Sequence, residues 1–165
     1  MKKVVVFSDS HSGLSFMRRA IHVLKPNAFI HLGDHYDDGA VIAEENPGIQ
    51  NYIVQGNCDW SLCFSEPEQM CLKVFGVLML LTHGHQYGVK AGTGKLEAYA
   101  RSKGVQAALY GHTHRADCRQ EGDLWVLNPG TCSHYGGSVG LILIEKDQIV
   151  ECRIITGEEL TELGK

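Results

Sequence analysis

The chain has 165 residues, enough to bury a core of its own, and we expect one domain over residues 1–165 with a polar C-terminal tail over residues 155–165. The formal net charge is −4 and no basic run occurs, so the sequence gives no electrostatic signal for nucleic acid. It has no stretch of about 18 apolar residues that would span a membrane. The apolar run after Lys2 and Lys3 is too short for a signal peptide, and we therefore expect a cytoplasmic protein.

The pattern of cysteines agrees with the expected cytoplasmic location. None of the cysteines forms a C-x-x-C pair, and a chain of this length does not need disulfides to fold. We expect free thiols in a reducing cytosol. The sequence has six cysteines: Cys58, Cys63, Cys71, Cys118, Cys132 and Cys152.

The N-terminal elements predict a parallel sheet. Residues 4–7 form a continuous apolar run, which is typical of a strand covered on both faces. Apolar residues at helical spacing predict a helix over residues 14–24, which Pro26 ends. A second apolar run covers residues 28–32. A strand, a helix and a strand within this length predict a βαβ unit with parallel strands.

The middle of the chain continues with short strands and helices. Its last strand leads into a loop that carries two histidines. The predicted elements are a helix over 37–45, a strand over 52–55, a loop over 60–69, a hairpin of strands 71–75 and 77–82, a helix from about residue 94 that ends at Gly104, and a strand over 107–110.

The C-terminal part changes character. Short strands separated by turn residues predict antiparallel pairing, and the turn over residues 128–131 is expected to pack under the loop that begins at Gly111. The glycine-rich run 92–95 lacks the spacing of a phosphate-binding loop and is better explained as a helix start. The predicted antiparallel strands cover residues 117–120, 124–127, 139–145 and 149–155.

Metal-ligand residues follow five of the predicted strands directly. The carboxyl ends of parallel strands meet at one edge of a sheet, where sites in open α/β folds form. The residues are Asp9, His11, Asp34, Asn57, His83, His112 and His114. Seven side chains are too many for one ion but suit two divalent ions, with Asp34 as the bridging carboxylate between them. Imidazole mixed with carboxylate and amide oxygen favours Mn, Fe, Ni or Zn.

The order of these motifs resembles the calcineurin-like metallophosphoesterase superfamily. The match covers roughly residues 3–155 and is most similar to the small bacterial and archaeal phosphodiesterases, which share their fold with the retromer scaffold subunit. The motifs are Asp9-Ser10-His11, Gly33-Asp34, Gly56-Asn57-Cys58-Asp59, Thr82-His83-Gly84-His85 and Gly111-His112-Thr113-His114. The resemblance implies an α/β (α+β) fold: a β-sandwich of two mixed sheets flanked by helices, with four layers in the order αββα.

The resemblance also implies a ligand set for each ion and a reaction. A water or hydroxide that bridges the ions would attack a phosphate ester, with in-line departure of the alkoxide. Manganese is the expected metal, with nickel, zinc or iron as alternatives. One ion would be held by Asp9, His11, Asp34 and His114, and the other by Asp34, Asn57, His83 and His112.

One position departs from the pattern of many family members. Where they have a histidine proposed to protonate the leaving group, this chain has Cys58 directly after Asn57. The small phosphodiesterases often have cysteine there too, so activity is compatible with it. His85 could supply the proton instead or orient a ligand, and His35 and His134 are weaker candidates. The predicted catalytic residues are therefore Asn57, Cys58 and His85.

The function that these residues predict is a metal-dependent phosphodiesterase acting on a small phosphate ester. One alternative is a non-catalytic interaction scaffold of the same fold, although such a scaffold would be expected to lose ligands, and none is lost here. Another is a phosphomonoesterase or nucleotide pyrophosphatase that uses the same metals. Loops such as 60–69 and 132–137 would shape the substrate groove. Exposed apolar surface on a sheet could support a homodimer.

Overall fold

The computed structural model describes residues 1–60 and 65–165. Residues 61–64 of the loop predicted over 60–69, and Cys63 with them, lie outside the described residues. The other five cysteines are free thiols, as expected. Within the described part of the chain, no helix is both long and apolar enough to cross a membrane.

The first sheet contains the predicted βαβ unit. Strand β1 pairs in parallel with β2, and β2 pairs in parallel with β3, while β9 runs antiparallel to β1 and pairs with β10 at the edge. The strand order is β10-β9-β1-β2-β3. The strands are β1 (Lys2–Phe7), β2 (Ala28–His31), β3 (Gln50–Ile53), β9 (Ser138–Glu145) and β10 (Gln148–Thr156).

The second sheet has the order β4-β5-β6-β8-β7 and is also mixed. The predicted hairpin of β4 and β5 is antiparallel, and so is the pair β7 and β8. Strand β8, however, also pairs with β6, and this pair is parallel. The prediction of antiparallel pairing for the C-terminal strands did not include it. The strands are β4 (Gln69–Val74), β5 (Val77–Thr82), β6 (Ala107–Leu109), β7 (Asp117–Glu121) and β8 (Leu124–Asn128).

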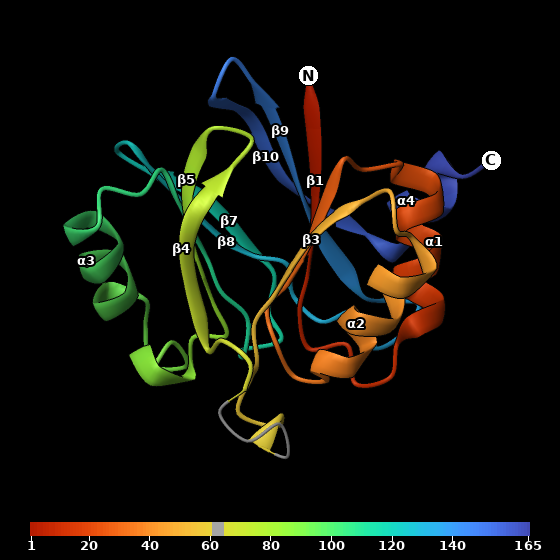
Figure 1. Cartoon of the computed structure of the whole chain (residues 1–165), viewed down its shortest axis with the longest axis horizontal. Coiled ribbons are helices and arrows are strands. Elements are labelled where there is room, and N and C mark those ends of the chain that lie inside the picture. The colour runs from red at the N-terminus through yellow and green to blue at the C-terminus, as the bar shows by residue number, and fades with distance from the viewer. Residues whose placement is uncertain (61–64) are drawn as a thin grey trace.

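The two sheets pack face to face and are covered by helices on both outer faces, which confirms the predicted αββα sandwich (Figure 1). Helices α1 (Leu14–Leu24), α2 (Tyr36–Glu45) and α4 (Gly157–Leu163) lie on the first sheet. Helix α3 (Gly94–Ser102) covers the second sheet and begins at the glycine-rich run, as predicted. A short 3-10 helix, η2 (His85–Tyr87), follows β5.

Alternation along the strands explains why the β1 run is apolar throughout. Val4 and Val6 point into the core between the two sheets, whereas Val5 and Phe7 point under the helices. All four side chains are fully buried. Strand β1 is thus held between two apolar layers, and the loop that follows it starts from a fixed position.

The C-terminal residues form a helix where a polar tail was expected. Helix α4 buries Leu160 fully, and this side chain belongs to the cluster under the first sheet. The Thr156 hydroxyl accepts a hydrogen bond from the backbone N–H of Glu159, which caps the helix. The T-x-x-E spacing is the sequence signature of a capping box, and it is the signal from which the helix could have been predicted.

Candidate metal centre

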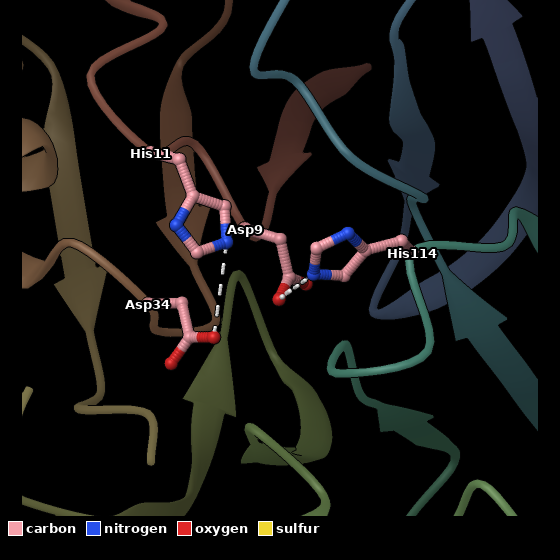
Figure 2. Close-up of side chains that lie close together, drawn as sticks. All are labelled: Asp9, His11, Asp34 and His114. Carbon is pink, nitrogen blue, oxygen red and sulfur yellow. Dashed lines mark ion pairs between the residues drawn. The ribbon is translucent and has the colours of Figure 1, made fainter. Parts of the chain in front are cut away.

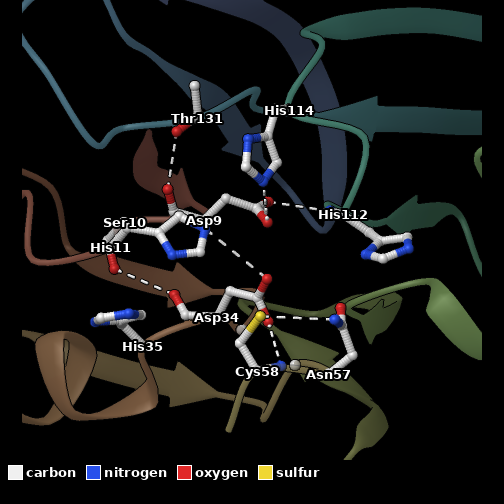
Figure 3. Close-up of polar contacts among 12 residues, drawn as sticks. Asp9, Ser10, His11, Asp34, His35, Asn57, Cys58, His112, His114 and Thr131 are labelled. Atoms are coloured by element: carbon white, nitrogen blue, oxygen red, sulfur yellow. Dashed lines mark hydrogen bonds and ion pairs between the residues drawn. The ribbon is translucent and has the colours of Figure 1, made fainter.

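The predicted ligands come together at one end of the sandwich, as Figure 3 shows for most of them. Asp9 and His11 follow β1, and Asp34 follows β2. Asn57 lies in the loop after β3, and His83 follows β5 directly. His112 and His114 follow β6. The carboxyl ends of the parallel strands of both sheets therefore meet at one site, which agrees with the expectation from sequence.

Four side chains form a compact cluster. One ligand atom from each of Asp9, His11, Asp34 and His114 lies within 4.8 Å of the others. The Nε2 atom of His114 is 3.1 Å from Oδ1 of Asp9, and Nε2 of His11 is 3.9 Å from Oδ2 of Asp34 (Figure 2). Two imidazoles and two carboxylates thus converge at the distance that a shared cation would require.

A second group of donors surrounds His83. Its Nε2 atom is 3.0 Å from Oδ1 of Asn57 and 3.5 Å from Oδ1 of Asp34. Its Nδ1 atom donates to the carbonyl oxygen of Leu32 over 2.8 Å. That bond fixes the ring and leaves Nε2 as the nitrogen that can face a metal. The ring of His112 lies 5.0 Å from that of His83, centroid to centroid.

Asp34 belongs to both groups because its two oxygens face different imidazoles. Oδ2 points to His11, and Oδ1 points to His83 and accepts the backbone N–H of Cys58 over 2.9 Å. Burial acts to raise the pKa of Asp34, but hydrogen bonding and charge from His83 and the Cys58 N–H outweigh it and hold the pKa well below its usual range. The carboxylate is therefore ionised and placed between the two sets of ligands.

A second observation also indicates that these residues fit a divalent cation. Oδ1 of Asp9 and Nε2 of His11 are buried without a hydrogen-bond partner among the described residues. Buried polar atoms are rarely left unpaired, because the loss of hydration then has no compensation. Both atoms point into the cluster, and a cation there would satisfy them together. Imidazole nitrogen with carboxylate oxygen suits Mn, Fe, Ni or Zn.

The backbone around the ligands is strained. Five of the seven predicted ligands have positive φ angles, which side chains other than glycine rarely adopt. Such conformations cost on the order of 1–3 kcal/mol each and persist only where the surroundings enforce them. The five residues are Asp9 (φ 53°), His11 (φ 42°), Asp34 (φ 57°), His112 (φ 70°) and His114 (φ 60°).

Two glycines allow the loops to approach one another. A Cβ atom on Gly111 would lie 1.9 Å from Oγ of Ser8 and 2.8 Å from Oδ2 of Asp9. A Cβ atom on Gly56 would lie 2.3 Å from Oδ1 of Asp34. Any side chain at either position would push a ligand carboxylate away. The glycines that precede His112 and Asn57 are therefore required for packing, not only for a turn.

The loop after β8 supports the ligand loops, as predicted. The Asn128 side-chain amide donates to the carbonyl oxygen of Gly111 over 3.1 Å and to Oγ1 of Thr113 over 2.9 Å. The Thr131 hydroxyl donates to the carbonyl oxygen of Asp9 over 2.8 Å. Asn128 is fully buried. These contacts hold the β1 and β6 loops in position against each other.

Asp59 has a similar supporting position. Its Oδ1 atom accepts the backbone N–H groups of His35 and Tyr36, both over 2.9 Å, and its Oδ2 atom accepts that of Gly56 over 2.7 Å. The Asp59 carboxylate is thus engaged by backbone groups, and it fixes the start of α2 beside the Asn57 loop.

Sequence reasoning missed a buried hydrogen-bond chain behind the centre. The Gly33 N–H donates to Nδ1 of His31, so Nε2 carries the proton and donates to Oγ of Ser10, and that hydroxyl donates to Oδ2 of Asp38. Burial lowers the pKa of His31 to about 4, against the raising effect of nearby carboxylates such as Asp38. Asp38 also accepts the backbone N–H of Ser12. The sequence feature that could have indicated this chain is the pair of serines on either side of His11.

The predicted catalytic residues lie around this cluster. The ring of His85 is 5.6 Å from that of His83 and 6.1 Å from that of His112, and its Nδ1 atom is buried without a hydrogen-bond partner in the described part of the chain. Cys58 is exposed, with Sγ 3.6 Å from Nδ2 of Asn57, and burial and then the Asp34 charge raise the pKa of its thiol.

The two weaker candidates lie on the other side of the centre. The His35 ring is 5.0 Å from that of His11. His134 is exposed and lines a groove with Phe16 and Tyr135. Neither side chain has a contact with Asn57, His83 or His112 among the described residues, so His85 and Cys58 remain better placed there.

An αββα sandwich with imidazole and carboxylate ligands at the carboxyl ends of its strands defines a class of metal-binding phosphoesterases. Residues 1–147 match the model of the calcineurin-like phosphoesterase superfamily domain, and the chain belongs to this superfamily. The resemblance inferred from the five motifs is thereby confirmed.

Related sequences and solved structures agree with this assignment. A probable metallophosphoesterase of Bacillus subtilis is 29% identical over 132 residues, covering 78% of this chain and 73% of the relative. A phosphodiesterase of Methanocaldococcus jannaschii is 25% identical over 167 residues, covering 90% and 97%. The crystal structure of a predicted phosphoesterase of Streptococcus pneumoniae is 26% identical, with a TM-score of 0.74 over 95% of this chain and 90% of the other.

The retromer-like fold is also found among the solved structures. Vps29 of Entamoeba histolytica, solved in complex with zinc, has a TM-score of 0.69 over 94% of this chain and 99% of its own. Its sequence identity is 19%, so this likeness concerns the fold alone.

Proposed function

We propose that the protein is a phosphodiesterase that uses two divalent metal ions. The observation that carries the proposal is the position of Asp34, whose two carboxylate oxygens face His11 on one side and His83 on the other. A carboxylate placed in this way can bridge two ions and reduce their repulsion. The M. jannaschii relative and one from Escherichia coli, 27% identical over 161 residues, are named phosphodiesterases, which supports the choice of substrate class.

Each ion would be held by one of the two groups of side chains. The ions, when bound, supply positive charge that activates a water molecule as nucleophile and neutralises the oxygens of the ester. Manganese is the metal we propose first, with nickel, zinc and iron as alternatives. The first group is Asp9, His11, Asp34 and His114, and the second is Asp34, Asn57, His83 and His112.

The proposal is tested by the hydrolysis of bis(4-nitrophenyl) phosphate and 4-nitrophenyl phosphate. Protein is treated with a chelator and assayed with and without added Mn²⁺. We expect turnover that depends on Mn²⁺ and a higher kcat/KM for the diester. A preference for the monoester would keep the metal centre and change the substrate class. No turnover with Mn²⁺, Ni²⁺ or Zn²⁺, although metal is bound, would favour a non-catalytic scaffold.

We propose His85 as the residue that protonates the leaving group. Its ring lies beside His83 and His112, and its Nδ1 atom has no hydrogen-bond partner among the residues that the structure describes. In a His85→Asn variant, kcat/KM should fall by about 10²–10⁴ for a diester with an alkoxide leaving group. The fall should be less than about tenfold for a nitrophenolate, which leaves without a proton.

The matched comparison for this prediction is Cys58→Ala, because the Cys58 thiol is the other proton donor close to the second ligand group. Both variants are assayed with the same two esters. If Cys58→Ala shows the dependence on the leaving group and His85→Asn does not, the thiol is the acid and the assignment to His85 is wrong.

A further inference from the structure

A groove lies next to the metal centre and shares a loop with it. Its volume is about 670 Å³, within the range of small-molecule sites. One wall is formed by Thr113 and Arg115, which continue the loop of His112. Residues 89–92, which precede α3, form another part of the lining. A substrate whose phosphate lies at the ligands could therefore extend one arm into this groove.

Two cations line the groove without an acidic partner among the described residues. Lys90 and Arg115 are exposed, and neither side chain forms an ion pair with any residue that the structure describes. The acidic residue of the groove, Asp117, is already paired with Arg119 and accepts a hydrogen bond from the Tyr110 hydroxyl. The groove therefore presents two uncompensated positive charges in a chain whose formal net charge is −4.

The two cations lie on different segments of the groove lining. Lys90 belongs to the segment of residues 89–92, and Arg115 directly follows the ligand His114. Thr113, which lies between His112 and His114 in the chain, also lines the groove. An arm of the substrate that extends from the centre past this loop would therefore enter a groove that contains both cations.

We infer that the groove binds a second phosphate group of the substrate, so the protein acts on phosphodiesters with one phosphorylated arm. This inference rests on the proposed phosphodiesterase function. A dianion suits a pair of cations, and the planar guanidinium of Arg115 matches the oxygens of a phosphate better than those of an uncharged arm. Lys90 and Arg115 determine specificity and do not take part in bond cleavage.

The test compares two 4-nitrophenyl phosphodiesters that differ in the second alcohol. One arm is a propyl group, and the other is a propyl group that ends in a phosphonate, which cannot be hydrolysed at the distal position. We expect kcat/KM to be about tenfold higher for the phosphonate ester, since two exposed charge contacts each contribute a few-fold. In the double variant Lys90→Gln/Arg115→Gln the ratio should fall to about one.

The matched control removes the same charge elsewhere. Lys73 is an exposed residue of β4 and Arg19 is a half-buried residue of α1, and Lys73→Gln/Arg19→Gln should keep the tenfold ratio. A ratio near one in the wild type, or an unchanged ratio in Lys90→Gln/Arg115→Gln, would overturn the inference while the propyl ester still reports an active centre. Failure to hydrolyse either ester with any metal would overturn the proposed function, and the inference with it.

Discussion

An Asp34→Asn variant should lose more than about 100-fold in kcat/KM for a phosphodiester and should bind fewer metal ions per chain. Residues that merely support metal ligands typically contribute 10–100-fold, and Asp34 faces both ligand groups itself. The asparagine can still accept the Cys58 N–H with its oxygen, so the loop should keep its shape. The change removes the negative charge that a two-ion centre requires. Steady-state kinetics and elemental analysis of dialysed protein measure the two effects.

The control for this variant is Asp37→Asn, which makes the same substitution in the first turn of α2 at an exposed carboxylate outside the centre. It should keep wild-type activity and metal content. If Asp34→Asn also kept both, Asp34 would not bridge two ions. A loss of activity with unchanged metal content would instead point to a role in orienting substrate.

Patterns that depend on burial were predictable from the sequence. The apolar run of β1 shows a strand covered on both faces, and the packing in the structure confirms this. Parallel strands place their carboxyl ends together, so residues distant in sequence such as Asp9, Asn57 and His112 could be assigned to one site before any distance was known. This reasoning needs only the order of strands and the residues that follow them.

Features that depend on the approach of one loop to another were not predictable in this way. The chain from His31 through Ser10 to Asp38 joins β2, the β1 loop and α2, and no periodicity relates these positions. The positive φ angles of the ligands depend on tertiary contacts, because Asp and His adopt such angles more often than most residues but still uncommonly. The parallel pairing of β8 with β6 likewise depends on contacts between residues that are distant in sequence.

An Asp9→Asn variant should be more stable than the wild type without metal and should lose most of the stabilisation that metal provides. Asp9 is fully buried, and its Oδ1 atom has no hydrogen-bond partner among the described residues, although Nε2 of His114 lies 3.1 Å from it. Its Oδ2 atom accepts from the Ser8 hydroxyl and the His112 N–H, and an asparagine oxygen can keep both bonds. The new amide would replace a buried negative charge that lies close to the carboxylate of Asp34, and removing this repulsion should stabilise the metal-free protein by about 1 kcal/mol.

Bound metal should also raise the free energy of unfolding of the wild-type protein, because the ligand set exists only in the folded state. Wild-type protein at about 100 times its Kd for Mn²⁺ should gain about 2.7 kcal/mol, or about 5–10 °C in Tm. Thermal unfolding with and without Mn²⁺ measures both effects, with Asp123→Asn in the exposed β7–β8 turn as the matched substitution. A variant at Asp9 that is less stable without metal and keeps the full shift would show that this carboxylate has a structural role. A variant that is more stable without metal and shows a smaller shift would mean that the two buried carboxylates destabilise the metal-free fold. The bound cation would then offset this cost.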